Sequence, residues 1–486
     1  MSQQRPNVLL IMADSLIQDF MGVYGDQAAC TPNLDALAAG GTAFRRAWCN
    51  SPLCAPSRAS MMTGRYVSDL GALDNANGFS SEIPTISHGF KARGYQATLV
   101  GKMHFVGHDQ THGFDAHLAN REDYSRGYDP NGFILAYDWE QPSGPNPTGK
   151  DWMGPSYVNG PQWDHYTAHY DMDNAIHAEA LRHMAELDGR SPFFTCVSYH
   201  QPHNPFWIPE SDKARFKNIR LPIPDIPADM PQRYGVMERW LNDFHYQTEL
   251  FDSIRTPENL RWLYETYYGM VYDLDRHVGE LLALLRRKGL AENTVVIFTA
   301  DHGEMLGHRG MIQKRCLYER SVRVPLIFNA PGRFRAGRML DAAVSLVDLL
   351  PTLADLVGVE PPEGLPGQSL LSTLESDKED GKDMPERTIF SEYHGEGVHA
   401  PCFMAVRGPY KLIYVHGHEE KLYHLPSDPD EYNDLSGDPT HAAAAAELKA
   451  AIRSHFDPDR IAASALASQK NRRYIYQAHQ GELNRA

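Results

Sequence analysis

Short apolar runs that end at a polar residue constrain the fold of this chain most strongly. Three of them occupy residues 7–13, 96–101 and 294–300. Continuous apolar stretches of this length are typical of parallel strands that are buried on both faces. Helical patterns separate the runs, so we predict an α/β fold built on a large, mostly parallel sheet sandwiched between helices.

The residue directly after each of these runs is charged. These residues are Asp14, Lys102 and Asp301. The carboxyl ends of neighbouring parallel strands meet at one edge of the sheet, and ligands bind beyond that edge. Three segments that are remote in sequence should therefore converge on one ligand site.

Apolar spacing predicts further elements around these runs. Strands are expected at 193–198 and 324–329, and helices at 84–93, 173–187, 258–290 and 346–357, with another helix opening at Thr31 and Pro32. The pattern dissolves over residues 116–170, which are rich in glycine, proline and aromatic residues. A structureless loop of that length is uncommon, so we predict an insertion with its own packing.

The C-terminal part of the chain has a different pattern. The polar stretch 375–387 is typical of a linker. Beyond it, hairpin-like spacing predicts strands at 403–407, 411–415 and 421–425, followed by an alanine-rich helix at 440–456. We therefore predict a catalytic domain over residues 1–375 and a smaller domain over 388–486, formed by an antiparallel sheet with a helix and a tail.

Composition excludes some partners. The chain has 486 residues, and 46 Lys and Arg against 62 Asp and Glu give a formal charge of −16. This balance disfavours general binding to nucleic acid or to an anionic membrane, so we expect neither. Six scattered cysteines show no disulfide framework, and the N-terminal apolar run is too short for a signal peptide. We therefore expect a cytoplasmic, reduced protein.

The motif Leu-Cys-Ala-Pro-Ser-Arg runs from Leu53 to Arg58. Proline suits the first turn of a helix, so Cys54 should lie at a helix N-terminus, with Gly64 at the other end. Free N–H groups and the helix dipole favour an anion there and should lower the pKa of the thiol. A lone cysteine is more often a buried structural residue. The spacing Cys-x-Pro-Ser-Arg is what favours a catalytic role.

A second motif, Asp-His-Gly-Glu, follows the strand at 294–300 and supplies Asp301 and His302. With Asp14 these residues offer two carboxylates and one imidazole. Oxygen-rich ligation suits Ca²⁺, and the imidazole also fits Mn²⁺. An isolated Asp-His pair usually belongs to a solvated loop, but convergence with Asp14 and Cys54 favours a divalent metal site.

An anionic substrate needs positive groups around it, because an overall negative protein does not attract it by itself. The candidates are Arg58, Lys102 and Lys314. A lone lysine is normally a solvated surface group, but Lys102 follows a strand end and lies close in sequence to His104. Positive groups there would neutralise substrate oxygens and transition-state charge, so we include all three in the predicted catalytic set.

Six segments of the chain stand in the order and spacing found in type I sulfatases of the alkaline phosphatase superfamily. The chain therefore resembles these sulfatases over nearly its whole length. They are residues 7–14, 31–35, 54–64, 101–104, 299–304 and 323–326. The resemblance implies an alkaline phosphatase-like fold and hydrolysis of sulfate monoesters to an alcohol and inorganic sulfate. It also implies one divalent metal held by Asp14, residue 54, Asp301 and His302. Many sulfatases have a second aspartate after the first, where this chain has Ser15.

The resemblance also implies a mechanism. A maturing enzyme, such as a formylglycine-generating enzyme, oxidises Cys54 to formylglycine, whose hydrate attacks sulfur and forms a covalent sulfo-enzyme intermediate. His203 and Lys314 match the positions that protonate the leaving alcohol. His104 matches the base that takes a proton from the second hydroxyl, so that sulfate leaves.

Some segments resemble choline sulfatases in particular, so choline sulfate is the favoured substrate beside other alkyl and aryl sulfates. The residues implied to contact substrate are Asn75, Lys102, His203, Lys314 and Glu396. Glu396, with aromatic side chains of the insertion, would hold a quaternary ammonium group by charge and cation–π attraction.

Two other functions fit the same residues. A phosphonate monoester or phosphodiester hydrolase could use this site, because these residues do not identify which tetrahedral anion is bound. A non-catalytic binder of sulfate esters is the alternative if Cys54 stays unconverted. The aromatic and basic tail at 472–476 fits a subunit contact or, equally, packing on the surface of its own chain; we expect a homo-oligomer.

Overall fold

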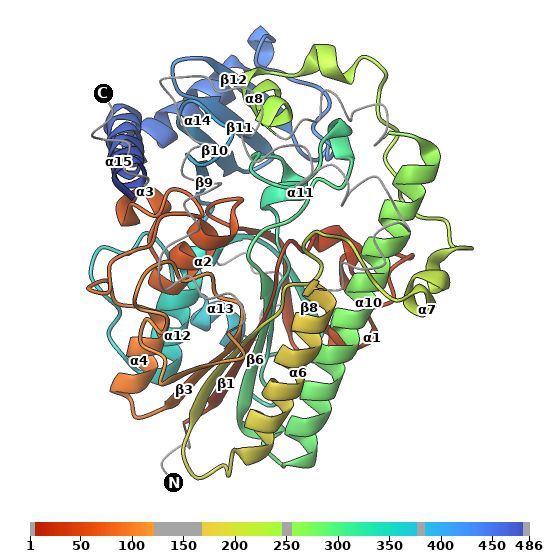
Figure 1. Ribbon diagram of the computed structural model, residues 1–486, viewed down its shortest axis with the longest axis vertical. Helices are drawn as coiled ribbons and strands as arrows, with labels where there is room; N and C mark the ends of the chain where they lie inside the picture. Colours follow the sequence, from red (N-terminus) through yellow and green to blue (C-terminus); the bar gives the residue numbers. More distant parts are fainter. Residues whose placement is uncertain (1–4, 121–167, 245–254, 377–383, 480–486) are drawn as a thin grey trace.

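The computed structural model describes residues 5–120, 168–244, 255–376 and 384–479. Most of the predicted insertion, with its aromatic residues between positions 121 and 167, lies outside these ranges, as does the middle of the predicted linker. The described residues form a large sheet covered by helices and a smaller C-terminal sheet (Figure 1).

The large sheet contains eight strands within the described residues, in the order β4-β3-β5-β1-β6-β7-β2-β8. Their bounds are β1 Asn7–Ala13, β2 Thr42–Trp48, β3 Gln96–Gly101, β4 Ala116–Leu118, β5 Phe193–Ser198, β6 Thr294–Ala300, β7 Leu326–Asn329 and β8 Arg338–Ser345. All neighbouring strands are parallel except β7, which runs antiparallel to β6 and β2. The predicted large, mostly parallel sheet is confirmed.

Helices cover both faces of the large sheet, and α14 packs on the small sheet (Figure 1). The α-helices of the described residues are α1 Pro32–Ala39, α2 Cys54–Thr63, α3 Val67–Leu70, α4 Ile86–Ala92, α6 Ala168–Glu186, α7 Glu210–Lys213, α8 Val236–Phe244, α10 Pro257–Arg287, α11 Glu319–Val322, α12 Leu349–Val357, α13 Leu371–Glu375, α14 Ala442–His455 and α15 Pro458–His479. Figure 1 shows α6 and α10 along one face and α2, α4 and α12 on the other. No helix in the described ranges has both the length and the apolar character needed to cross a membrane.

The register of the central strands brings their carboxyl ends to one edge of the sheet. Ala13 of β1 lies opposite Ala300 of β6, and Gly101 of β3 lies opposite Ser198 of β5. Strand β3 can approach β5 this closely because Gly101 has no side chain. A Cβ there would lie 2.2 Å from the carbonyl oxygen of Ser198. The residues that follow these paired ends are Asp14, Lys102 and Asp301. Their predicted convergence is thus built into the strand register.

The sequence pattern misses several elements. Strands β2 and β8 pair at one side of the large sheet and carry exposed or half-buried residues among buried ones, so their apolar runs are interrupted. Strand β4 falls inside the range predicted as an insertion, and α6 begins five residues before the predicted helix at 173–187. The long helix α15 follows the alanine-rich helix and has no strong apolar stripe.

The C-terminal strands form a second, antiparallel sheet in the order β12-β11-β10-β9. Their bounds are β9 Ile389–Tyr393, β10 Cys402–Arg407, β11 Tyr410–Val415 and β12 Glu419–His424. The three predicted strands and the alanine-rich helix α14 are therefore present, with β9 added at one edge. Apolar residues of β10 and β11 join the same buried core as the large sheet, and the division into two domains stays a prediction.

Charged side chains are buried where the small sheet meets α11. Lys411 Nζ lies 2.9 Å from Glu319 Oε1 and 2.8 Å from Glu431 Oε1. Trp48 Nε1 donates to Glu319 Oε1 at 2.9 Å. Removal of one partner of a buried ion pair is strongly destabilising, because the other charge is left uncompensated. This network therefore fixes β11 against the large sheet.

Candidate active site

Four side chains converge at the carboxyl edge of the large sheet. Asp14 follows β1, Cys54 opens α2, and Asp301 and His302 follow β6. Their ligand atoms all lie within 4.8 Å of one another, and all four residues are buried; it is the only such group in the described part of the chain. His302 Nε2 lies 3.3 Å from Cys54 Sγ, 3.9 Å from Asp14 Oδ1 and 3.7 Å from Asp301 Oδ1. The predicted metal ligands thus lie together.

The turn after β6 presents both Asp301 and His302 to this cluster. Gly303 is required there, because a Cβ would lie 2.0 Å from the carbonyl oxygen of Arg320. His302 Nδ1 lies 2.9 Å from the Gly303 carbonyl oxygen, which places the proton on Nδ1 and leaves Nε2 as an acceptor. Burial lowers the pKa of His302 to about 4, so the ring is neutral, as a metal ligand must be.

Arg58 orients the two carboxylates of the cluster. Its Nε donates to Asp301 Oδ2 at 2.7 Å, and its Nη2 donates to Asp14 Oδ2 at 3.1 Å. The third nitrogen, Nη1, donates to the Lys102 carbonyl oxygen at 2.6 Å and to Ser198 Oγ at 2.8 Å. The guanidinium thereby occupies one oxygen of each carboxylate, and the Oδ1 atoms are the ones near His302.

Two lysines supply positive charge beside the cluster. Lys102 Nζ lies 3.1 Å from Asp14 Oδ2, and Lys314 Nζ lies 2.6 Å from His203 Nε2. Burial by itself would raise the pKa of Asp14, but the charges of Lys102 and Arg58 outweigh it and hold this pKa well below its ordinary value. Asp14 is therefore an ionised carboxylate between the positive side chains of Arg58 and Lys102.

Ser15 contacts both carboxylates, although it cannot act as a second charged ligand. Its Oγ donates to Asp14 Oδ1 at 2.9 Å, and its backbone N–H donates to Asp301 Oδ1 at 3.1 Å. Lys314 Nζ lies 3.5 Å from the same Oγ. The backbone of Ser15 has φ 64°, a left-handed conformation that costs energy for this residue type. Tyr267 OH donates to the Ser15 carbonyl oxygen at 2.5 Å and so supports this turn.

Cys54 begins helix α2 as predicted, and Gly64 closes the helix with φ 65°. The predicted lowering of the thiol pKa is wrong. Burial, with the negative charge of Asp14 next, raises the pKa of Cys54 to about 11. One helix N–H is also already used, because Ala55 N–H donates to Asn75 Oδ1 at 3.0 Å. Desolvation and a neighbouring carboxylate therefore outweigh the helix dipole.

Asn75 and Glu396 form a group next to the cluster. The Asn75 backbone N–H donates to Glu396 Oε1 at 3.4 Å, and Arg315 Nε lies 3.9 Å from Glu396 Oε2. Tyr393 OH donates to the Glu396 carbonyl oxygen at 2.6 Å. Burial raises the pKa of Glu396. These contacts join Glu396 to protein groups. The insertion aromatics predicted as its partners lie outside the described residues, except Tyr170, which packs against Trp207.

His104 is buried two residues beyond Lys102, with φ 58°. Sequence reasoning missed Ser198, which accepts a hydrogen bond from Arg58. The rule that polar residues at strand ends form the site would have included it, since Ser198 ends the predicted strand at 193–198. Tyr267 has no such signal, because it is one apolar-face residue of a long helix.

The fold places this cluster at the carboxyl edge of an α/β sheet, and comparison with known proteins identifies the family. The model of the sulfatase family matches residues 6–359, and the model described as N-sulphoglucosamine sulphohydrolase, C-terminal, matches residues 307–457. A choline-sulfatase of Rhizobium meliloti (strain 1021) is 32% identical over 98% of this chain and 92% of its own length. The chain belongs to the sulfatase family.

Solved structures agree with the fold. The phosphonate monoester hydrolase of Agrobacterium radiobacter has a TM-score of 0.74 at 24% identity, over 93% of this chain and 96% of its own. A protein solved with its substrate, D-glucosamine-2-N,6-O-disulfate, has a TM-score of 0.72 at 23% identity, over 94% and 99%. At these identities the likeness shows the alkaline phosphatase-like fold alone. Family membership makes the protein a sulfuric ester hydrolase.

Proposed function

We propose that this enzyme hydrolyses a small sulfate monoester, with residue 54 oxidised to formylglycine and one divalent metal, Ca²⁺ or Mn²⁺, held by Asp14, Asp301, His302 and residue 54. The observation that carries the proposal is the convergence of these four side chains at the N-terminus of α2. Two carboxylates and a neutral imidazole fit either ion. The bound metal would polarise a sulfate oxygen, and the hydrated formylglycine would supply an oxygen nucleophile.

The positive side chains around residue 54 bind and orient the sulfate group. Lys102 and Lys314 lie at hydrogen-bond distance from Asp14 and His203 respectively. Arg58 has all its hydrogen bonds within the protein and so positions the carboxylates. Fixed charges of this kind stabilise negative charge as it develops in a transition state.

His203 and Lys314 hold the proton that the leaving alcohol needs. Burial, with the charge of Lys314 next, keeps the pKa of His203 well below its ordinary value, so the ring is neutral. The Lys314 ammonium therefore donates to His203 Nε2 across 2.6 Å. We expect His203→Asn to slow hydrolysis of choline sulfate more than hydrolysis of an aryl sulfate, because a phenolate leaves without protonation. Equal losses on both substrates contradict this role.

His104 is the proposed base for sulfate release, because it is buried in the loop that also carries Lys102. Its backbone is held in the left-handed region, which is common at functional positions. A maturing enzyme for Cys54, a homo-oligomeric state and a cytoplasmic location stay predictions.

Intact mass spectrometry with a turnover assay tests the proposal. Oxidation of the Cys54 thiol to an aldehyde lowers the mass by about 18 Da, and Cys54→Ala should then abolish turnover while the protein stays folded. Cys402→Ala, at a buried cysteine of the small sheet, is the matched control and should remain active. An unmodified mass together with no turnover supports the non-catalytic binder instead.

A substrate panel then separates the substrate classes. Choline sulfate is the first candidate, because the choline-sulfatase of Rhizobium meliloti is 32% identical over 98% of this chain. The comparison compounds are an aryl sulfate and an aryl phosphonate monoester. We expect the sulfates to give the higher kcat/KM, and a preference for the phosphonate would favour the alternative hydrolase.

A further inference from the structure

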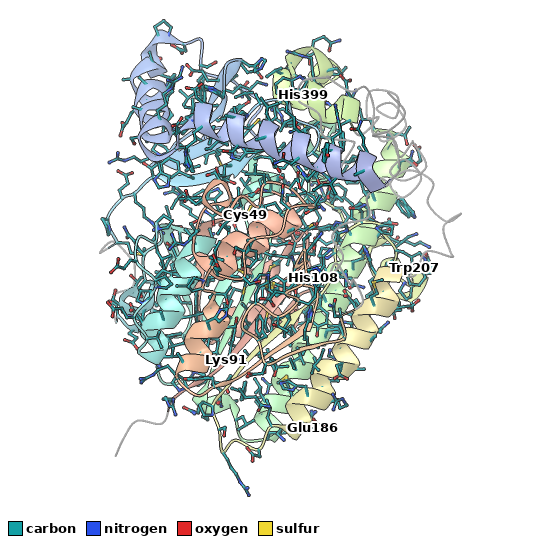
Figure 2. All side chains as sticks on the ribbon, turned by 60° about the vertical axis from the view of Figure 1, so that its left-hand side comes forward. Cys49, Lys91, His108, Glu186, Trp207 and His399 are labelled. Atoms are coloured by element: carbon teal, nitrogen blue, oxygen red, sulfur yellow. The ribbon has the colours of Figure 1, made fainter. Side chains whose placement is uncertain are left out.

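Helix α15 packs against the loop that follows α3. Figure 1 shows the two helices side by side, and Figure 2 shows the long last helix across the junction of the small sheet and the N-terminal segments. Arg472 of α15 donates two hydrogen bonds to the carboxylate of Asp74, from Nη2 to Oδ2 at 2.7 Å and from Nη1 to Oδ1 at 3.1 Å. One turn earlier, Ser468 Oγ accepts from Asn77 Nδ2 at 3.4 Å. The C-terminal helix therefore holds this loop at two points.

The pair of Arg472 with Asp74 is buried, unlike an ordinary surface ion pair. The side chain of Asp74 is 1% exposed and that of Arg472 is 13% exposed. Exposed ion pairs contribute little to protein stability, whereas loss of the partner of a buried carboxylate strongly destabilises the folded protein. Ser468 and Arg472 are four residues apart and so lie on one face of the helix. Without Arg472 the loop would have to move until water reached Asp74.

The same loop contacts the start of α2. Asp74 Oδ1 also accepts the backbone N–H of Ala76 at 2.9 Å, which folds the loop around Asn75. Asn75 Oδ1 accepts the backbone N–H of Ala55, the residue after Cys54. From the other side, Glu396 accepts the backbone N–H of Asn75. The position of Asn75 is thus defined from both the C-terminal helix and the small sheet.

We propose that Arg472 is a positioning residue for the hydrolytic reaction. Its pair with Asp74 holds Asn75 against the first turn of α2, beside residue 54, so that the Asn75 side chain stays at the sulfate position. The proposal rests on the proposed sulfatase function and on the substrate contact that the sequence predicts for Asn75. It makes the C-terminal helix part of the active-site support, nearly 400 residues from Asn75 along the chain.

Steady-state kinetics of Arg472→Gln test this role. A misplaced binding group affects both binding and chemistry, so we expect kcat/KM for choline sulfate or an aryl sulfate to fall by about 10- to 100-fold. The inhibition constant of inorganic sulfate should rise as well. Arg472→Lys keeps the charge without the bidentate geometry and should be intermediate. Arg460→Gln is the matched control, because it makes the same charge change at an exposed position of α15 and should behave as wild type.

A double-mutant comparison separates positioning from general stability. If Arg472 acts through Asn75, Arg472→Gln has no further effect on kcat/KM in the Asn75→Ala background. An equal fold-loss in both backgrounds, or no loss in the wild-type background, overturns the proposal. If Arg472→Gln does not fold, Arg472→Lys and Ser468→Ala carry the same comparison.

Hydrogen exchange keeps this proposal separable from the proposed function. We expect faster amide exchange over residues 74–77 in Arg472→Gln than in Arg460→Gln, whether or not any ester is hydrolysed. Unchanged exchange overturns the contact itself. Faster exchange with unchanged sulfate inhibition overturns the positioning role. Absence of turnover in the wild-type protein would instead refute the proposed function.

Discussion

Arg58→Lys tests whether Arg58 matters for the orientation of the proposed metal ligands or only for its positive charge. Arg58 forms four hydrogen bonds, two of them to the carboxylates of Asp14 and Asp301. Lysine keeps the positive charge but lacks the planar fork, so at least two of these bonds are lost. Bonds to charged groups contribute about 1.5–3 kcal/mol each, so the loss of two should lower the free energy of unfolding by about 3–6 kcal/mol.

The affinity for metal should fall as well, because the Oδ1 atoms are no longer held towards His302. Loss of such support for metal ligands typically costs about 10- to 100-fold in affinity. Isothermal titration with Ca²⁺ and Mn²⁺, beside urea unfolding of the metal-free protein, measures both effects. Arg309→Lys is the control, since Arg309 is also buried, 3.5 Å from Glu238, but lies outside the cluster. Wild-type metal affinity in Arg58→Lys would refute the orientation argument.

Two further predictions concern Ser15 and the buried network of the small sheet. Ser15→Asp adds a carboxylate beside Asp14, so the metal-free protein should be less stable than wild type. Its gain in Tm on addition of Ca²⁺ should be larger than that of wild type or of the control Ser15→Asn. Equal gains in Tm contradict this. Burial raises the pKa of Glu431 from 4.5 to about 7 although Lys411 lies beside it, so its neutral form favours the folded state and this stability is lost as pH rises through that range. Between pH 5 and 8 the free energy of unfolding should fall more in wild type than in Glu431→Gln, and the two falls should differ by up to about 3 kcal/mol. Parallel pH curves for the two proteins would contradict the buried-carboxyl argument.

Much of the fold follows from the local pattern. Strands β1, β3, β5 and β6 are buried on both faces, so their apolar runs are uninterrupted and their ends are visible in the sequence. Strands β2 and β8 escape notice because half-buried residues break their runs. Helix α15 escapes notice because its contacts with the loop after α3 depend on a partner far away in sequence.

The sequence by itself determined the family pattern and the residues that are predicted to do the chemistry. Polar residues at strand ends, and the motifs around Cys54 and Asp301, identify the predicted ligands because parallel strands deliver their ends to one edge. Only the tertiary structure decided how these groups are charged and aimed. The pKa of Cys54 is raised instead of lowered, since burial and Asp14 act on it through space. The support of Asn75 by Arg472 likewise depends on contacts between segments that local sequence patterns do not relate.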